Sequence, residues 1–248
     1  MRKWLLVLLL TFAFVLPAMA GSPEPGGTDI PITAVIVPED GAQLAAAPIE
    51  TAEKTGQLMK GAPVTVETLG VYWCRVTDGA QSGFVPTAAL HFDDWGAPGP
   101  QSAAAPETPR LAVFNVGMSP GGHWTMTLRE TDSRKGAPMD TCIAGTVMIV
   151  LAQGKEFTLV HTGGKAGYLL TKYLSFHSAA QTPEKYAVVS NDDQVNLRYD
   201  RRFGYSGIIT ALEPGTVVTL IWEKKGWACV ETGGYQGYVV SEFLDIQD

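Results

Sequence analysis

The chain has 248 residues, of which 46% are hydrophobic and 17% charged, and it carries 27 glycines and 16 prolines. This composition is typical of a globular protein that is rich in turns. With 25 acidic residues against 18 Lys and Arg, the formal net charge of −7 disfavours nucleic acid and other phosphate-rich partners.

The first 20 residues are typical of a secretory signal peptide. Arg2 and Lys3 form a positively charged start, residues 4–16 form an apolar run, and Ala18 and Ala20 supply small residues at the cleavage positions. The run is shorter than the roughly 20 apolar residues that a membrane span needs, so no integral membrane segment is expected. We therefore predict a protein that is secreted or associated with the cell envelope.

After the expected signal peptide, one pattern of residues occurs three times in the sequence. In each copy a glycine is followed, at steps of 12, 3, 7 and 7 residues, by an aromatic residue, a valine, a second glycine and a leucine. These positions are Gly61, Trp73, Val76, Gly83 and Leu90, then Gly145, Phe157, Val160, Gly167 and Leu174, then Gly215, Trp227, Val230, Gly237 and Leu244. The identical spacing predicts three homologous domains, over residues 30–92, 110–176 and 185–248.

The connections between the repeats differ in length and composition. Residues 93–109 are rich in Pro, Ala and Gly and are expected to form an extended linker. The second repeat carries a six-residue insertion within 117–124, and a shorter joint at 178–184 leads into the third repeat. The second and third domains are therefore expected to have the more restricted mutual orientation.

Short alternating apolar runs, such as residues 217–221, predict β-strands. The first glycine of each copy is expected at a tight turn with positive φ, and the second at a bulge or bend within a strand. Thr-Gly-Gly sequences at 162–164 and 232–234 predict hairpin turns and not phosphate-binding loops, because both lie at the same offset of the repeat. The fold class is therefore all-β, with three small barrels joined by linkers.

The third repeat carries a resemblance to a known family. It combines residues 195–198 (Val-Asn-Leu-Arg) with residues 212–217 (Leu-Glu-Pro-Gly-Thr-Val), Gly226-Trp227 and 237–239 (Gly-Tyr-Val), and it resembles the bacterial SH3-like (SH3b) domain. The second repeat has Phe157 where that family usually has tryptophan, and the first is the most divergent. The resemblance implies tandem SH3-like barrels, and it specifies the fold better than the ligand.

No catalytic or metal-binding group is expected. Cys74, Cys142 and Cys229 fall in different repeats, match no metal motif and have no histidine nearby in sequence, so no catalytic residue, metal or cofactor is predicted. The three repeats also leave no stretch of about 100 residues for a catalytic domain. The chain is thus predicted not to be an enzyme.

Aromatic residues in loops are the candidate ligand-binding residues. The loop of the third repeat combines three aromatic residues with arginines, and the resemblance places it beside a ligand-binding groove. A second candidate is the insertion of the second repeat. The residues are Tyr199, Phe203, Tyr205, Arg198, Arg201 and Trp124. The alternative is that two of the three aromatics fill their own barrel and that Trp124 closes the end of another.

Two functions remain open. The first is an exported, non-catalytic binding protein that recognises cell-wall peptide, glycan or another envelope component, with avidity from repetition. The second is a scaffold that docks a protein partner, either an enzyme or a receptor.

Overall fold

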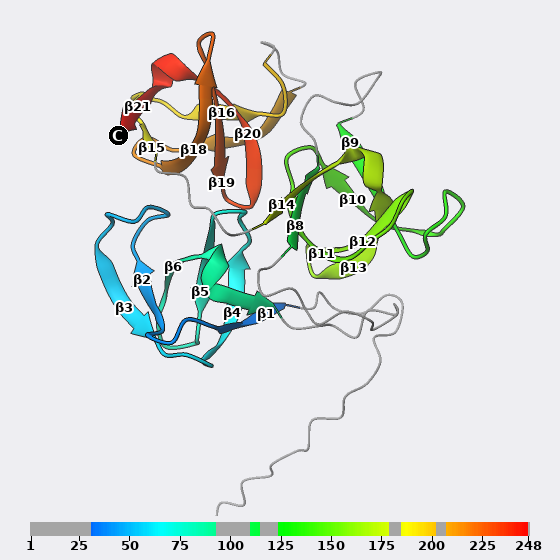
Figure 1. The fold of residues 1–248 in the computed structure, drawn as a ribbon. Helices are drawn as coiled ribbons and strands as arrows, with labels where there is room; N and C mark the ends of the chain where they lie inside the picture. The colour runs from blue at the N-terminus through cyan, green and yellow to red at the C-terminus, as the bar shows by residue number, and fades with distance from the viewer. Residues whose placement is uncertain (1–30, 93–109, 115–123, 179–184, 202–206, 248) are drawn as a thin grey trace, which may run out of the picture.

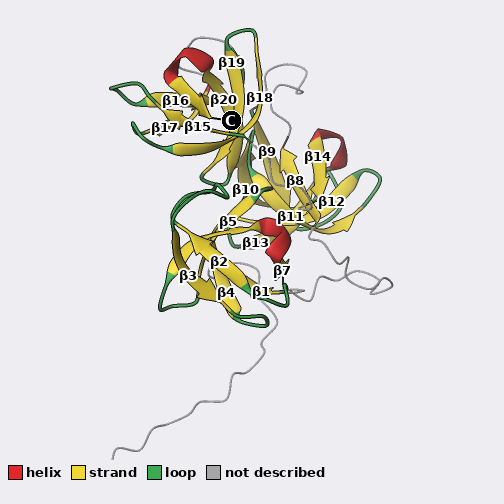
Figure 2. Cartoon of the chain, turned by 60° about the vertical axis from the view of Figure 1, so that its left-hand side comes forward, coloured by secondary structure: helices red, strands yellow, loops and turns green. Residues whose placement is uncertain are grey.

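The computed structural model describes residues 31–92, 110–114, 124–178, 185–201 and 207–247. The expected signal peptide and the expected linker at 93–109 lie outside these residues, as do Phe203 and Tyr205. The described residues form three antiparallel sheets of seven strands each, with short 3-10 turns and no α-helix. The prediction of an all-β protein is therefore confirmed (Figure 2).

Each sheet contains seven strands, and a 3-10 turn precedes its last strand. The first sheet has β1 (Ile32–Ile36), β2 (Ala42–Ala45), β3 (Lys54–Leu58), β4 (Pro63–Thr68), β5 (Trp73–Thr77), β6 (Ser82–Pro86), η1 (Thr87–Ala89) and β7 (Leu90–Phe92). The second has β8 (Arg110–Phe114), β9 (Thr125–Arg129), β10 (Pro138–Ile143), β11 (Val147–Gln153), β12 (Phe157–Thr162), β13 (Lys165–Leu170), η2 (Thr171–Tyr173) and β14 (Leu174–Ser178). The third has β15 (Tyr186–Val189), β16 (Val195–Arg198), β17 (Ile208–Leu212), β18 (Val217–Lys224), β19 (Trp227–Thr232), β20 (Tyr235–Val240), η4 (Ser241–Phe243) and β21 (Leu244–Gln247).

The three sheets share one strand order. In the first sheet the order is β3-β2-β6-β5-β4-β1-β7, and the corresponding strands follow the same order in the second and third. Among the described residues no strand ladder joins the two end strands of a sheet. Closure into barrels and the domain boundaries therefore stay predictions.

Alternation of side chains places the core. In β1 and β4 the buried residues alternate with more exposed ones, so one face of the sheet is apolar. Each sheet has one fully buried leucine on its second strand, namely Leu44, Leu128 and Leu197. Burial of such a side chain stabilises a fold by roughly 1.5–3 kcal/mol.

The turn glycines behave as the sequence predicts. Gly61, Gly145 and Gly215 have φ of 77°, 92° and 79°, which L-residues with a side chain rarely adopt. At the hairpin between β19 and β20, Gly233 and Gly234 have φ of 59° and 85° between the paired residues Thr232 and Tyr235. Two positive φ angles in a two-residue loop are typical of a type I′ turn, so the hairpin prediction is confirmed.

A bulge or a bend was expected at the strand glycines, and Gly237 shows no bulge. The ladder between β19 and β20 runs without a register shift through Gly237. A Cβ on Gly237 would lie 2.8 Å from the carbonyl oxygen of Arg198 and 2.8 Å from Leu197. Glycine is therefore required because β16 crosses closely over β20.

The three sheets pack against one another, as Figure 1 shows for the blue, green and red parts of the chain. Leu111, Val113, Val147 and Ile149 of the second sheet join the core cluster of the first. The β19–β20 hairpin of the third sheet contacts the second: Val147 N–H donates to Gly234 C=O at 3.0 Å, and Gln236 N–H donates to Gly145 C=O at 2.9 Å. The contact between the first and second sheets could not be predicted from the composition of the linker that joins them.

Candidate functional site

The second sheet carries a groove of about 350 Å³ beside β9. Its walls are aromatic and aliphatic, and two arginines stand at its rim. The lining residues are Phe114, Thr125, Met126, Thr127, Arg129, Arg134, Phe157, Leu170 and Tyr173. The volume and the mixture of an apolar surface with a few polar groups are typical of small-ligand sites.

The cationic side chains at this groove each contact a neighbouring group of the second repeat. The Arg129 guanidinium donates a hydrogen bond to the Gly136 carbonyl at 2.8 Å, which fixes its position. Arg134 forms an exposed ion pair with Glu156 at 3.3 Å, and this contact contributes little to stability. The Lys172 ammonium lies 4.6 Å from the centre of the Tyr173 ring. Two arginines thus line an aromatic groove, and Lys172 lies against one of its rings, in a chain whose net charge is negative.

A smaller groove lies at the corresponding place in the third sheet. Its volume is about 110 Å³, and its lining residues are Asn191, Gln194, Val195, Asn196, Arg198, Val240 and Phe243. By the repeat spacing, Arg198 is the counterpart of Arg129, and Phe243 is the counterpart of Tyr173. The predicted residue Arg198 therefore lines a groove, but the larger groove belongs to the second sheet and was not found from the sequence.

Two of the predicted ligand-binding aromatics pack against each other. The Trp124 and Tyr199 rings have centroids 4.5 Å apart at an interplanar angle of 31°. Tyr199 also packs against the core cluster of the second sheet, although it belongs to the third repeat. Burial raises the pKa of Tyr199, and the nearby Asp200 adds to this effect. The geometry favours an inter-sheet packing role for this pair.

Arg201 belongs to another aromatic cluster, on the outside of the third sheet. Its guanidinium lies 5.9 Å from the ring centres of both Trp222 and Tyr238, and these two rings are 5.6 Å apart. Trp222 is 37% exposed. Trp222 and Tyr238 were not identified from the sequence. Tyr238 lies between the buried Gly237 and Val239, which places it on the outer face of β20, whereas Trp222 follows the register shift in β18.

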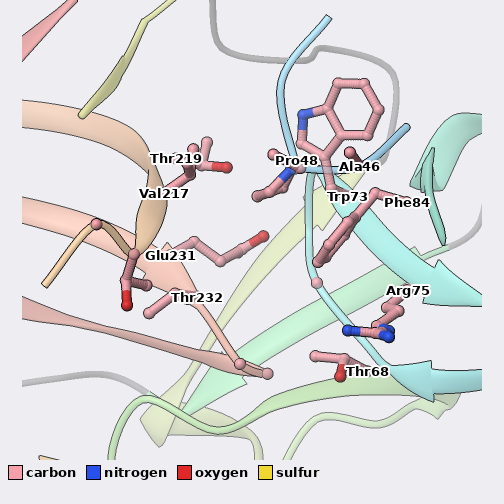
Figure 3. Close-up of a pocket in the computed structure, with 16 residues that line it drawn as sticks. Ala46, Pro48, Thr68, Trp73, Arg75, Phe84, Val217, Thr219, Glu231 and Thr232 are labelled. Atoms are coloured by element: carbon pink, nitrogen blue, oxygen red, sulfur yellow. The ribbon is translucent and has the colours of Figure 1, made fainter. Parts of the chain in front are cut away.

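A third cavity lies between the first and third sheets, with a volume of about 440 Å³ (Figure 3). Trp73, Arg75 and Phe84 line it from the first sheet, and Thr219 and Glu231 line it from the third. Glu231 is only 4% exposed. Burial raises the pKa of its carboxyl to about 7, although hydrogen bonds from Gln236 and from backbone N–H groups act in the opposite direction.

The cysteines show no sign of a reactive site. Cys74, Cys142 and Cys229 are free and buried, and burial raises the pKa of their thiols to about 11, 12 and 12. Within the described residues no group of three or more His, Cys, Asp or Glu side chains could hold a metal ion. In the same part of the chain, no helix has the length and apolarity that a membrane crossing requires.

Comparison with known proteins gives similarity in structure alone. No family model matches the chain, and no curated protein matches it. Matching solved structures include NlpC2 from Trichomonas vaginalis (8% identity, TM-score 0.25, 89% of this chain and 97% of that chain) and NlpC1 from the same organism (10%, 0.24, 94% and 93%). A putative autolysin from Listeria monocytogenes also matches (12%, 0.21, 87% and 96%). TM-scores of this size do not assign the chain to a family.

Proposed function

We propose that the protein is an exported, non-catalytic binding protein built from three SH3-like barrels, and that it recognises a component of the cell envelope. The observation that carries the proposal is the groove of the second sheet, which combines Phe157 and Tyr173 with Arg129 and Arg134. The signal peptide predicted at residues 1–20 supports a location outside the cytoplasm.

The groove fits a short peptide that bears a carboxylate. Arginine presents several N–H donors in a planar fork that pairs well with a carboxylate. The rings of Phe157 and Tyr173 offer contact area for aliphatic side chains at low entropic cost. Peptides of bacterial cell walls combine these two chemical features, and for this reason we favour wall peptide over glycan as the ligand of this groove.

Retention on purified cell-wall sacculi tests this function. The mature chain, residues 21–248, should bind sacculi, and soluble wall peptides should compete. Arg134→Ala and Arg129→Ala should each weaken binding by about 1–2 kcal/mol, the range of a contributing interface residue. Arg110→Ala is the matched control, because Arg110 is an exposed arginine at the other end of β8 from the groove residue Phe114.

The outcome depends on the difference between these variants. Equal retention of all three would show that the arginines of the groove do not bind the wall. Because Arg129 also supports the Gly136 loop, its variant needs an unchanged melting temperature. Arg134 is exposed, and its variant serves where the Arg129 variant is unstable.

A docking role for a protein partner is the second candidate, and the cluster of Trp222, Tyr238 and Arg201 favours it. Exposed tryptophan, tyrosine and arginine are the residue types that contribute most to protein interfaces. Recovery of one stoichiometric protein by the mature chain, lost on Trp222→Ala but not on Arg134→Ala, would support docking over wall binding.

A further inference from the structure

The cavity between the first and third sheets has two walls of different chemistry (Figure 3). The wall from the first sheet presents the rings of Trp73 and Phe84 together with Pro48. The wall from the third sheet presents Thr219 and Glu231. A ligand that bridges these walls must have an apolar face and a hydrogen-bonding edge.

Two polar groups that line this cavity make no side-chain hydrogen bond with another described residue. Thr219 is 3% exposed, and its hydroxyl makes no hydrogen bond with any other described residue. Trp73 is 7% exposed, and the same holds for its indole N–H. Figure 3 shows the hydroxyl of Thr219 directed toward the aromatic wall. Neither atom is among the buried polar atoms without a partner, so each is accessible to a ligand in the cavity that can hydrogen-bond to it.

The charged groups at the cavity already have partners within the protein. The Arg75 side chain pairs with Glu67 at 2.9 Å and lies 5.9 Å from the centre of the Phe84 ring. The Glu231 carboxyl accepts hydrogen bonds from Tyr72 N–H at 3.1 Å and from the Gln236 side chain at 2.9 Å. An anionic ligand would find no unpaired cation among these groups, and a cationic ligand would meet a carboxyl whose ionisation is disfavoured by burial. The cavity is therefore suited to a neutral, polar ligand.

We propose that this cavity binds a neutral saccharide segment, held between the first and third sheets. The C–H face of a sugar ring packs on the negative face of an aromatic ring, here Phe84 or Trp73. Its hydroxyl groups bond to Thr219 and to the second lone pairs of the Glu231 carboxyl. This site is separate from the groove of the second sheet, and its occupation does not depend on peptide binding there.

Calorimetric titration of the mature chain with chitotriose, maltotriose and trigalacturonic acid tests the proposal. We expect a neutral trisaccharide to bind with Kd between about 0.1 and 10 mM, and the anionic trisaccharide to bind more weakly. Thr219→Val keeps the shape of the side chain and removes the hydroxyl, so it should raise Kd about fivefold to tenfold. Thr210→Val, on the exposed strand β17, is the control and should leave Kd unchanged.

Phe84→Ala is the second variant, because it removes one stacking ring that is only half-buried. It should abolish saccharide binding while retention on sacculi through Arg134 persists. No binding of either neutral trisaccharide at 20 mM, about twice the weakest expected Kd, would overturn the proposal. So would binding that neither Thr219→Val nor Phe84→Ala weakens, since the sugar would then lie elsewhere. Loss of binding in Arg134→Ala but not in Thr219→Val would place the sugar in the groove of the second sheet.

Discussion

The Glu231 carboxyl accepts a hydrogen bond from the backbone N–H of Tyr72 at 3.1 Å, although the two residues lie 159 positions apart and in different repeats. Gln236 donates a second hydrogen bond to the same carboxyl at 2.9 Å. A carboxyl buried at the boundary of two sheets is costly to ionise. The contact between the first and third sheets is therefore expected to depend on pH.

Replacing Glu231 should change how stability depends on pH. Burial raises the pKa of Glu231 from 4.5 to about 7 in the folded chain. Its contribution to stability is therefore complete below about pH 4.5 and is lost as pH rises through 7. Burial lowers the pKa of His161 from 6.5 to about 4, so its contribution is complete above pH 6.5 and is lost as pH falls through 4.

The two effects oppose each other between pH 4.5 and 6.5. The free energy of unfolding of the unmodified chain should change little across this range. In Glu231→Gln it should rise with pH by about 2–3 kcal/mol, because the contributions of the buried histidines His161 and His177, whose pKa values burial lowers, are no longer opposed by Glu231. Urea unfolding at several pH values measures this, and identical pH profiles of the two proteins would contradict the raised pKa.

Gly145→Ala should weaken the contact between the second and third sheets and so lower the free energy of unfolding. Gly145 has a φ of +92°, and a Cβ there would lie 2.2 Å from the carbonyl oxygen of Gln236. Gly215 occupies the same turn of the third repeat at φ +79°, with nothing within 4 Å of its added Cβ. In both alanine variants the positive φ lowers the free energy of unfolding by about 1–2 kcal/mol. We expect Gly145→Ala to destabilise the chain by about 2 kcal/mol more, and equal urea midpoints would show that the clash relaxes freely.

The rings of Trp124 and Tyr199 should couple energetically. A double-mutant cycle of Trp124→Ala and Tyr199→Ala should give an interaction energy of about 0.5–1.5 kcal/mol for unfolding, as for other aromatic pairs. If both rings instead served a ligand, the single variants would leave the melting temperature unchanged. If the two single changes in the free energy of unfolding add up to that of the double variant, the rings do not interact, and the packing role is contradicted.

The repeat spacing predicts local structure well. Gly61, Gly145 and Gly215 have the expected positive φ because a turn of fixed geometry limits which residue can stand there. The Thr-Gly-Gly hairpins follow for the same reason. These features depend on residues that are close in sequence, so a pattern that occurs three times in one chain is enough to predict them.

The contacts between sheets could not be predicted in this way. The partners Glu231 and Tyr72, or Trp124 and Tyr199, do not occupy matching positions of the repeat, so periodicity carries no information about them. The groove of the second sheet is a different case. Arg129 is the counterpart of Arg198 by simple counting, and applying the same criterion to both repeats would have identified it.

The three thiols should be nearly inert in the folded chain. The thiolate is the reactive form of cysteine, and burial raises the pKa of Cys74 from 9.0 to about 11. At pH 8 this shift alone lowers the thiolate fraction about 100-fold, and Cys74 is also 0% exposed. Its sulfur lies 3.3 Å from the Thr87 hydroxyl, in the interior of the first repeat.

Labelling by iodoacetamide should therefore require unfolding. All three cysteines should be modified in 6 M guanidinium chloride, and almost none should be modified without it. Because the thiols are free, reductant should leave the melting temperature unchanged. Fast labelling of Cys74 under native conditions would mean that the first sheet opens frequently, and a melting temperature lowered by reductant would mean that a disulfide forms.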